Sequence, residues 1–114
     1  MIKQRDILLV PFPFSNQSGK KFRPVVVISN NNFNDYSEDI LVVGITSNIS
    51  KDKYTILLNK DKLEEGDFSI PCCIKVENIL KIDKGLIIRK IGKIKPKILD
   101  ELSFKLTEIL KLDK

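Results

Sequence analysis

The feature of this sequence that most constrains its fold is the close spacing of short apolar runs, rich in Val and Ile, along residues 7–94. Runs of this composition suit strands that lie on a pleated, half-buried surface. The connections between them are too short for the crossovers that parallel neighbours need, so most strands must pair antiparallel. The sequence therefore predicts a mostly β fold, a small curved antiparallel sheet or barrel, as one domain over residues 1–114.

The sequence marks some of the predicted strands more strongly than others. Val25–Ile28 is the strongest, because an unbroken run of β-branched residues follows Pro24. Ser69–Val76 contains Pro71, which favours an edge strand or a bulge because proline has no N–H for the ladder. Asp61–Gly66 predicts a turn or a single helical turn. The other strands are predicted at Ile7–Val10, Ile40–Ile45, Tyr54–Leu58, Leu86–Ile88 and Lys90–Ile94.

From Pro96 onward the apolar residues change from the period of a strand to that of a helix. Charged residues separate them, which gives the segment one apolar and one polar face. Proline fits the first turn of a helix, where its missing N–H costs no hydrogen bond. We therefore expect one amphipathic terminal helix packed on the sheet through Ile98, Leu99, Leu102, Leu106, Ile109 and Leu110. The polar stretch Ser29–Asp35 has room for one further helical turn.

Charge and composition narrow the chemistry that the chain can support. A net charge of +5 and a pI near 9.2 favour a polyanionic partner, with a solvated lysine-rich surface as the alternative. The sequence has no histidine, which excludes Ser-His-Asp and Cys-His sites and makes a standard zinc site improbable. It also lacks a P-loop, a GxGxxG motif and carboxylates at metal-binding spacing. We therefore expect neither a metal nor a cofactor, and polar groups suited to phosphate.

The cysteines and the N-terminal residues indicate in which cellular compartment the protein is expected. Cys72 and Cys73 are adjacent, and neighbouring cysteines rarely bridge because the geometry is strained. We expect reduced strand residues, with a dimer-interface or reactive thiol as the alternative. The N-terminus is charged and lacks a signal-peptide core, and no apolar run approaches the roughly 18 residues of a membrane span. The expectation is a cytoplasmic protein that does not contact a membrane.

Polar residues at two predicted strand ends could bind phosphate. Arg23 precedes Pro24 and the most strongly marked strand, so a rigid backbone would hold a guanidinium whose forked donors fit phosphate oxygens. Thr46–Asn48 ends another strand, and its hydroxyls and amide can orient a phosphate. Position alone leaves two alternatives open. Arg23 could form a solvated ion pair, and Thr46–Asn48 could be a turn that satisfies its own backbone.

Four segments follow one another in a distinctive order along the chain. They are Asp6–Phe14 (DILLVPFPF), Gly19–Ser29 (GKKFRPVVVIS), Val43–Asn48 (VGITSN) and Ile82–Gly92 (IDKGLIIRKIG). In this order they closely resemble the MazF/PemK family of toxins from bacterial and archaeal toxin–antitoxin modules. The first two segments are the more specific, and the later two add weight through their spacing. The resemblance extends from about Arg5 to the terminal helix.

The resemblance implies an SH3-like or CcdB-like barrel, a symmetric homodimer, and a ribonuclease that cuts single-stranded RNA at short sequences. It also implies a cognate antitoxin whose extended segment occupies the RNA groove. In the family, the arginine of the RP motif and the threonine of the ITS motif act at the scissile phosphate, and they correspond to Arg23 and Thr46. Because RNA carries its own 2′-OH nucleophile, cleavage would need charge stabilisation but no metal.

The same comparison suggests residues that would contact the RNA. The loop Asn16–Phe22 would cover the substrate, and its lysines could hold backbone phosphates. Other contacts would come from the end of the ITS motif and from the segment before Ile82. The RNA-binding residues expected in this way are Asn16, Ser18, Lys20, Lys21, Ser47, Asn78 and Lys81.

The chain departs from the family pattern in one segment. Well-known members carry Gln-Ile-Arg-Thr before the Asp-Lys pair, where this chain has Asn78–Lys81 with Leu80 in place of the arginine and Lys81 in place of the threonine. The departure puts cleavage specificity in question and favours one alternative, an inactive RNA-binding relative. A second alternative is a gyrase inhibitor of the same fold, like the CcdB toxins. Asp6 is expected to be a turn or strand-start residue rather than a catalytic acid.

Overall fold

One curled sheet carries most of the computed structural model, which describes residues 1–12 and 21–114. Within these residues, seven strands pair antiparallel in the order β4-β6-β3-β2-β1-β7-β5. The strands are β1 (Asp6–Phe12), β2 (Lys21–Val27), β3 (Asp39–Thr46), β4 (Thr55–Leu58), β5 (Leu63–Glu65), β6 (Cys72–Asp83) and β7 (Arg89–Ile94). The helical elements are α1 (Asn31–Tyr36), α2 (Pro96–Ile109) and the 3-10 turns η1 (Lys60–Lys62) and η2 (Lys84–Leu86). The predicted mostly β, antiparallel fold is confirmed.

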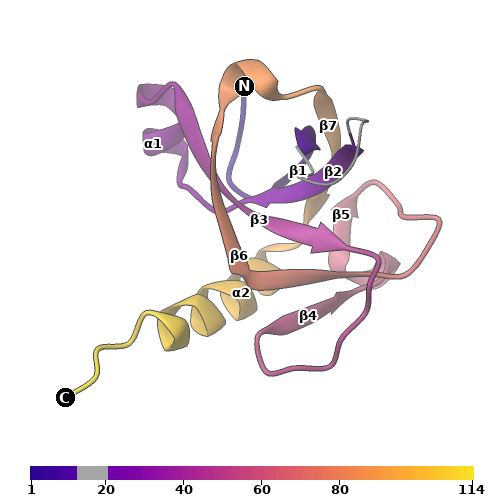
Figure 1. Cartoon of the computed structure of the whole chain (residues 1–114). Coiled ribbons are helices and arrows are strands. Elements are labelled where there is room, and N and C mark those ends of the chain that lie inside the picture. The colour runs from indigo at the N-terminus through magenta and orange to yellow at the C-terminus, as the bar shows by residue number, and fades with distance from the viewer. Residues whose placement is uncertain (13–20) are drawn as a thin grey trace.

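Because the sheet curls, both faces of its central strands are buried (Figure 1). Successive residues of a strand point to opposite faces, and both Ile7 and Leu8 of β1 are buried. One face belongs to a first apolar cluster, which α2 closes by inserting Ile98 and Leu102. The strands contribute its other buried members, Ile7, Val26, Val43, Ile45, Ile56, Leu58, Leu63, Cys72, Ile74, Val76 and Ile94. The other face belongs to a second cluster, formed by Leu8, Val10, Val25, Val27, Ile40, Val42 and Ile82.

The predicted terminal helix is confirmed as α2, which runs from Pro96 to Ile109. Leu110, expected on its packed face, instead follows the end of the helix and is 64% exposed. Figure 1 shows α2 lying against β6, while α1 lies beside β3 at the other side of the curl. Its apolar face packs on the first cluster, partly through Leu99, Leu106 and Ile109. In the described ranges, no helix is long and apolar enough to cross a membrane.

The strand predicted at Leu86–Ile88 is wrong, because the chain forms the turn η2 there and then continues without regular structure. The Asp83 carboxylate accepts the Gly85 N–H at 2.7 Å, and the Ile87 N–H donates to the Lys84 carbonyl at 3.2 Å. Local bonds of this kind satisfy backbone groups that a strand would offer to a neighbour. The apolar run alone does not reveal this competition.

The strand containing Pro71 is also displaced from its prediction. β6 begins at Cys72 and runs to Asp83, and it lies inside the sheet between β4 and β3. Of the two alternatives that Pro71 suggested, the edge strand is wrong, and the bulge of β6 lies at Val76–Asn78 rather than at the proline. Pro71 stands just before the ladder, where its missing N–H interrupts no pairing. The segment Asp61–Gly66 does contain part of the predicted helical turn, and then adds the short strand β5 against β7.

Asp6 connects the N-terminal turn to β7. It is 1% exposed, and its carboxylate accepts the Lys3 N–H at 2.9 Å. The ammonium groups of Lys90 and Lys93 lie 3.4 and 3.9 Å from its Oδ1. This places Asp6 at a strand start, as expected, with a structural role.

We expect Asp6→Ala to lower the free energy of unfolding by about 2 kcal/mol, because a buried charged acceptor is removed from its donors. Urea unfolding followed by circular dichroism measures the change. Asp113→Ala removes the same charge from the exposed C-terminal tail and should change stability by less than about 0.5 kcal/mol. Equal stability of the two variants would contradict the structural role of Asp6.

Candidate active site

The candidate site forms where β2 and β3 separate. In the described part of the chain, these strands pair over Val25–Val27 and Val42–Gly44. The residue of β2 that precedes Val25 is Pro24. It pairs with Leu9 of β1 but has no N–H to donate toward β3. The ladder between β2 and β3 therefore ends at this point, and the side chains beyond it line an opening in the sheet.

The register brings Arg23 and Thr46 to the same face of that opening. Val25 lies opposite Gly44, so two residues further on Arg23 and Thr46 occupy facing positions. Thr46, the last residue of β3, is held from the other side by pairing with Cys73 of β6. The two side chains that the sequence singled out therefore meet at one end of the sheet. Their catalytic role stays a prediction.

Two adjoining hollows share the side chains of Arg23, Pro24, Ile45 and Thr46 as a common wall. The larger hollow, of about 400 Å³, is partly aromatic and is completed by Phe22, Ser47, Asn48, Phe68, Ser69, Ile70 and Cys72. The smaller hollow, of about 240 Å³, is completed by Gly44, Lys75 and Asn78. A cation and a hydroxyl therefore border both spaces.

The two shared polar groups differ in their surroundings. Arg23 is half-buried, and its Nε is enclosed by protein. Thr46 Oγ1 accepts the Asn48 N–H at 3.1 Å. A hydroxyl that accepts in this way still has its own proton to donate. The pair therefore offers a guanidinium, which is charged at any working pH, and an oriented hydroxyl donor.

A bulge in β6 shapes the smaller hollow. Pairing with β3 skips Val76–Asn78 beside Gly44, and such bulges bend a strand and redirect its side chains. The Asn78 amide lies directly over Gly44: a Cβ at Gly44 would be 2.6 Å from Asn78 Nδ2. The absence of a side chain at position 44 thus leaves room for the amide at the floor of the hollow.

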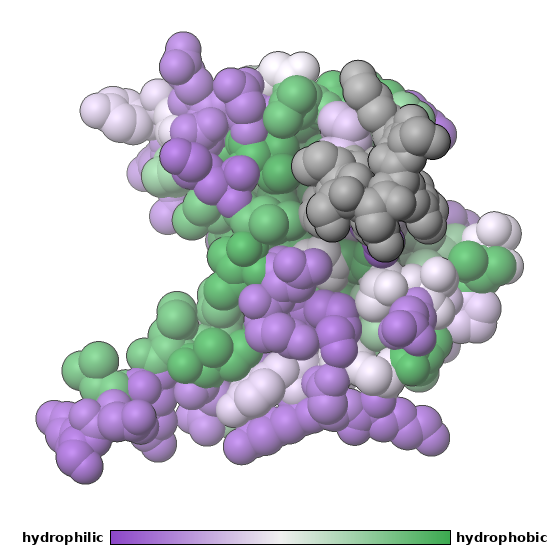
Figure 2. Space-filling model, in the orientation of Figure 1, coloured by the Kyte–Doolittle hydropathy of each residue, from purple (hydrophilic) through white to green (hydrophobic). Residues whose placement is uncertain are grey.

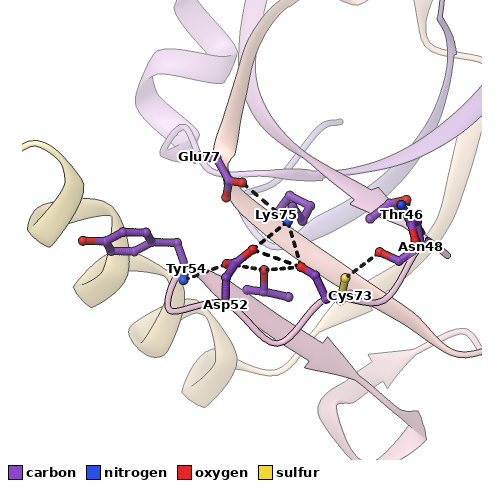
Figure 3. A network of polar contacts seen from close by, with 9 residues as sticks. Thr46, Asn48, Asp52, Tyr54, Cys73, Lys75 and Glu77 are labelled. Atoms are coloured by element: carbon purple, nitrogen blue, oxygen red, sulfur yellow. Dashed lines mark hydrogen bonds and ion pairs between the residues drawn. The ribbon is translucent and has the colours of Figure 1, made fainter.

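Lys75 sits at the centre of a polar network at the rim of the smaller hollow (Figure 3). Its Nζ donates to Ser50 Oγ at 2.9 Å and to Asp52 Oδ2 at 3.0 Å, and lies 3.6 Å from Glu77 Oε2. The hydrogen bond to Asp52 raises the pKa of Lys75. Hydrogen bonds from Thr55 and then Lys75 hold the pKa of Asp52 well below its usual range. Both groups are charged at neutral pH.

Not all the residues predicted to contact RNA meet at these hollows. Ser47 lines the larger hollow and Asn78 the smaller. Lys81 lines neither; it is exposed, and its Nζ lies 3.8 Å from the Asp39 carboxylate. Lys21 opens β2, but its side chain is outside the described part. Asn16, Ser18 and Lys20 also lie outside the described residues.

Two of the positions that depart from the family pattern, Leu80 and Lys81, lie away from the two hollows, whereas Asn78 of the same segment lines the smaller one. Leu80 packs against the second apolar cluster, and it pairs with Val42 on the part of β6 beyond the bulge. Lys81 follows on the exposed side. The substituted positions therefore leave the wall formed by Arg23 and Thr46 unchanged.

The cysteines lie close to the site but are buried. Burial, and then the neighbouring Cys73, raises the pKa of the Cys72 thiol, which lines the larger hollow. A protonated thiol is a poor nucleophile. Among residues 1–12 and 21–114, no three Cys, Asp or Glu side chains are grouped as metal ligands.

Several site residues were not predicted from the sequence. Gly44, Phe68 and Ile70 come together only through the curl of the sheet, and no local pattern marks them. Lys75 does leave a signal, because it is a charged residue inside the apolar run Cys72–Val76. A charge in a strand that pairs on both sides usually has a specific partner, and here the partner is Asp52.

A curled antiparallel sheet closed by a C-terminal helix is the fold of the MazF toxins. The MazF of the MazE–MazF crystal structure (Form III) from Deinococcus radiodurans superposes with a TM-score of 0.79 at 15% identity, covering 98% of both chains. The Mycobacterium tuberculosis toxin MazF-mt6 superposes with a TM-score of 0.77 at 17% identity, over 96% of this chain and 100% of that one.

The sequence itself gives the family. Residues 3–110 match the model described as the PemK-like, MazF-like toxin of type II toxin–antitoxin systems. A protein named Endoribonuclease MazF, from Staphylococcus saprophyticus, is 31% identical over 108 residues, or 90% of this chain and 86% of that protein. The chain belongs to the PemK-like, MazF-like toxin family, as the sequence motifs predicted.

Gly44→Ala tests the floor of the smaller hollow. The new methyl group should displace the Asn78 amide, which is the movable end of a side chain, so we expect thermal unfolding to change little. The side-chain NH₂ signals of Asn78 in an NMR spectrum should shift clearly. Unchanged Asn78 signals would show that the amide does not lie over Gly44.

Proposed function

We propose that this chain is the toxin of a type II toxin–antitoxin module and acts as an endoribonuclease on single-stranded RNA. Its family, and a relative named as an endoribonuclease, support this class of activity. The observation that carries the proposal for this chain is the meeting of Arg23 and Thr46 on the wall between the two hollows. That wall is where the scissile phosphate would lie.

RNA supplies its own nucleophile for the proposed reaction. The 2′-OH attacks the adjacent phosphorus, and the bond from phosphorus to the 5′ oxygen breaks. The 2′-OH gives up a proton and the departing 5′ oxygen takes one up, so the products are a 2′,3′-cyclic phosphate and a 5′-OH. The protein must align the 2′-OH and stabilise the negative charge that develops around phosphorus, and neither task requires a metal.

Arg23 and Thr46 match these two tasks. The guanidinium would bind the non-bridging oxygens through charge-assisted hydrogen bonds, which strengthen as negative charge accumulates in the transition state. The Thr46 hydroxyl, already oriented by the Asn48 N–H, would donate its proton to a phosphate oxygen. One group supplies charge and the other fixes the direction of the phosphate.

The two hollows would hold the nucleotides on either side of the cleaved bond. In the larger one, Phe22 and Phe68 provide surfaces on which a base can stack. In the smaller one, the Asn78 amide can hydrogen-bond to the edge of a base. Bases can reach these spaces only if they are splayed out, which favours single-stranded over duplex RNA.

We further propose a cognate antitoxin and a second copy of this chain as protein partners. One mycobacterial neighbour is an endoribonuclease in complex with its cognate antitoxin, with a TM-score of 0.75 at 16% identity, over 100% of this chain and 99% of that one. On the face seen in Figure 2, apolar side chains gather along α2, whose Phe104 is 69% exposed.

Sedimentation equilibrium tests the proposed homodimer. It should give twice the 13.1 kDa mass of one chain. A monomer mass at all concentrations would exclude the homodimer.

The nuclease proposal is tested by RNA digestion with end mapping. We expect Arg23→Ala to lower the cleavage rate by at least about a hundredfold, because it removes the stabilising charge, and Thr46→Val to lower it by about tenfold or more. Cleavage should persist in EDTA and leave a 2′,3′-cyclic phosphate. A substrate with a single 2′-O-methyl group at the mapped site should be resistant there.

The controls separate the alternatives. Circular dichroism and urea unfolding must show that both variants are folded. If EDTA stops the reaction, the metal-free mechanism is wrong. RNA binding without cleavage over a panel of sequences would instead identify an inactive binding relative. Absence of RNA cleavage together with recovery of gyrase in a pull-down would identify a gyrase inhibitor of this fold.

A further inference from the structure

The segment that follows Thr46 is anchored to β6 at two points. The Cys73 thiol contacts the Asn48 carbonyl at 3.8 Å, and the Asn48 N–H in turn holds Thr46 Oγ1. Further along, Lys75 binds both Ser50 and Asp52 (Figure 3). Cys73 and Lys75 lie two residues apart on the same face of β6, so one strand supplies both of these anchors. At the end of the loop, Lys105 of α2 also donates to the Lys53 carbonyl, at 2.8 Å.

Asp52 fixes the far end of this connection. Its Oδ1 accepts the Thr55 hydroxyl at 2.7 Å and the Tyr54 N–H at 3.1 Å. Its Oδ2 accepts from Lys75 and from the Ser50 hydroxyl, both at 3.0 Å. The two carboxylate oxygens thus have different partners: Oδ1 binds the start of β4, and Oδ2 joins the loop to Lys75.

We propose that Lys75 is a positioning residue for RNA cleavage, which holds the loop Ser47–Lys53 so that Thr46 presents its hydroxyl toward Arg23. This inference rests on the proposed nuclease function. Most of the loop is exposed and has no strand partner of its own, so its order depends on side-chain anchors. Displacing a reacting group by about 1 Å can cost about a hundredfold in rate.

Direct contact between Lys75 and the RNA backbone is the alternative, and the geometry favours positioning. The ammonium group already faces Ser50, Asp52 and Glu77, and the two carboxylates outweigh its single charge. A phosphate would have to displace these partners and approach two negative groups. The side chain is also only 23% exposed.

The test uses three variants of the full chain in a quantitative cleavage assay. Lys75→Met removes the anchor, and Lys75→Arg retains a cation that can still reach Ser50 and Asp52. Asp52→Asn breaks the same contact from the other side, because the amide can keep an oxygen toward Thr55 and Tyr54 but presents an NH₂ group to Lys75. We expect Lys75→Met and Asp52→Asn each to lower kcat by about tenfold to a hundredfold with KM within about twofold, and Lys75→Arg to restore most of kcat.

Lys90→Met is the matched control. Lys90 also lies between two carboxylates, at 3.1 Å from Glu65 and 3.4 Å from Asp6, but it is on β7, with β2 and β1 separating that strand from β3 in the sheet. This variant loses the same charge and should lose stability while keeping kcat per folded molecule. The double variant of Lys75→Met with Asp52→Asn should be no slower than either single variant, because both break one contact.

Hydrogen exchange provides a readout that does not depend on cleavage. The amides of Ser47–Lys53 should exchange faster in Lys75→Met and Asp52→Asn, and at the wild-type rate in Lys90→Met. Unchanged kcat or unchanged exchange in Lys75→Met would overturn the proposal. A direct phosphate contact would instead raise KM in Lys75→Met. It would also reduce the slope of the logarithm of the RNA-binding constant against the logarithm of salt concentration by about 0.7, and this result would overturn the proposal. If the wild-type chain cleaves no RNA, the proposed function fails, and exchange alone then decides whether Lys75 anchors the loop.

Discussion

The missing N–H of Pro24 is the constraint on which the candidate site depends. Pro24 lies in β2 between β1 and β3, and because it cannot donate toward β3, the ladder between β2 and β3 ends at the pair of Val25 and Gly44. The curl of the sheet keeps both faces of these strands buried up to that point, and the two apolar clusters make the register hard to shift. A one-residue slip would move Arg23 to the opposite face from Thr46. The same packing that stabilises the fold therefore fixes the geometry of the site.

β6 is the second determinant, because it supplies the other walls. Its first half pairs with both β3 and β4, and carries Cys73 and Lys75 beneath the loop that follows Thr46. Its bulge then turns Asn78 over Gly44, and its second half returns to the second apolar cluster through Leu80. A long strand that changes partners along its length can in this way serve a rigid core and a polar site at once.

Sequence reasoning predicted what depends on local pattern and missed what depends on pairing. The run Val25–Ile28 and the helical period after Pro96 identified β2 and α2 because burial imposes those periods directly. The turn at Lys84–Leu86 was missed because one hydrogen bond from Gly85 to Asp83 outweighs an apolar run. Lys81 was expected at the site on the strength of a neighbouring motif, yet the bulge before it moves the strand away from the hollows. Arg23 and Thr46 could be named, but their facing register could not be read from the sequence.

Fold alone does not establish the chemistry, since structural neighbours at about 15% identity share only the architecture. The family links this chain to RNA cleavage, and its polar groups suit a substrate that carries its own nucleophile. A site without histidine and with a buried, protonated Cys72 is poorly suited to acyl transfer, which needs a base and an activated nucleophile. In the proposed reaction the 2′-OH would attack, and Arg23 and the oriented Thr46 hydroxyl would stabilise the developing charge. The residues that line the site therefore fit the proposed reaction better than they fit acyl transfer.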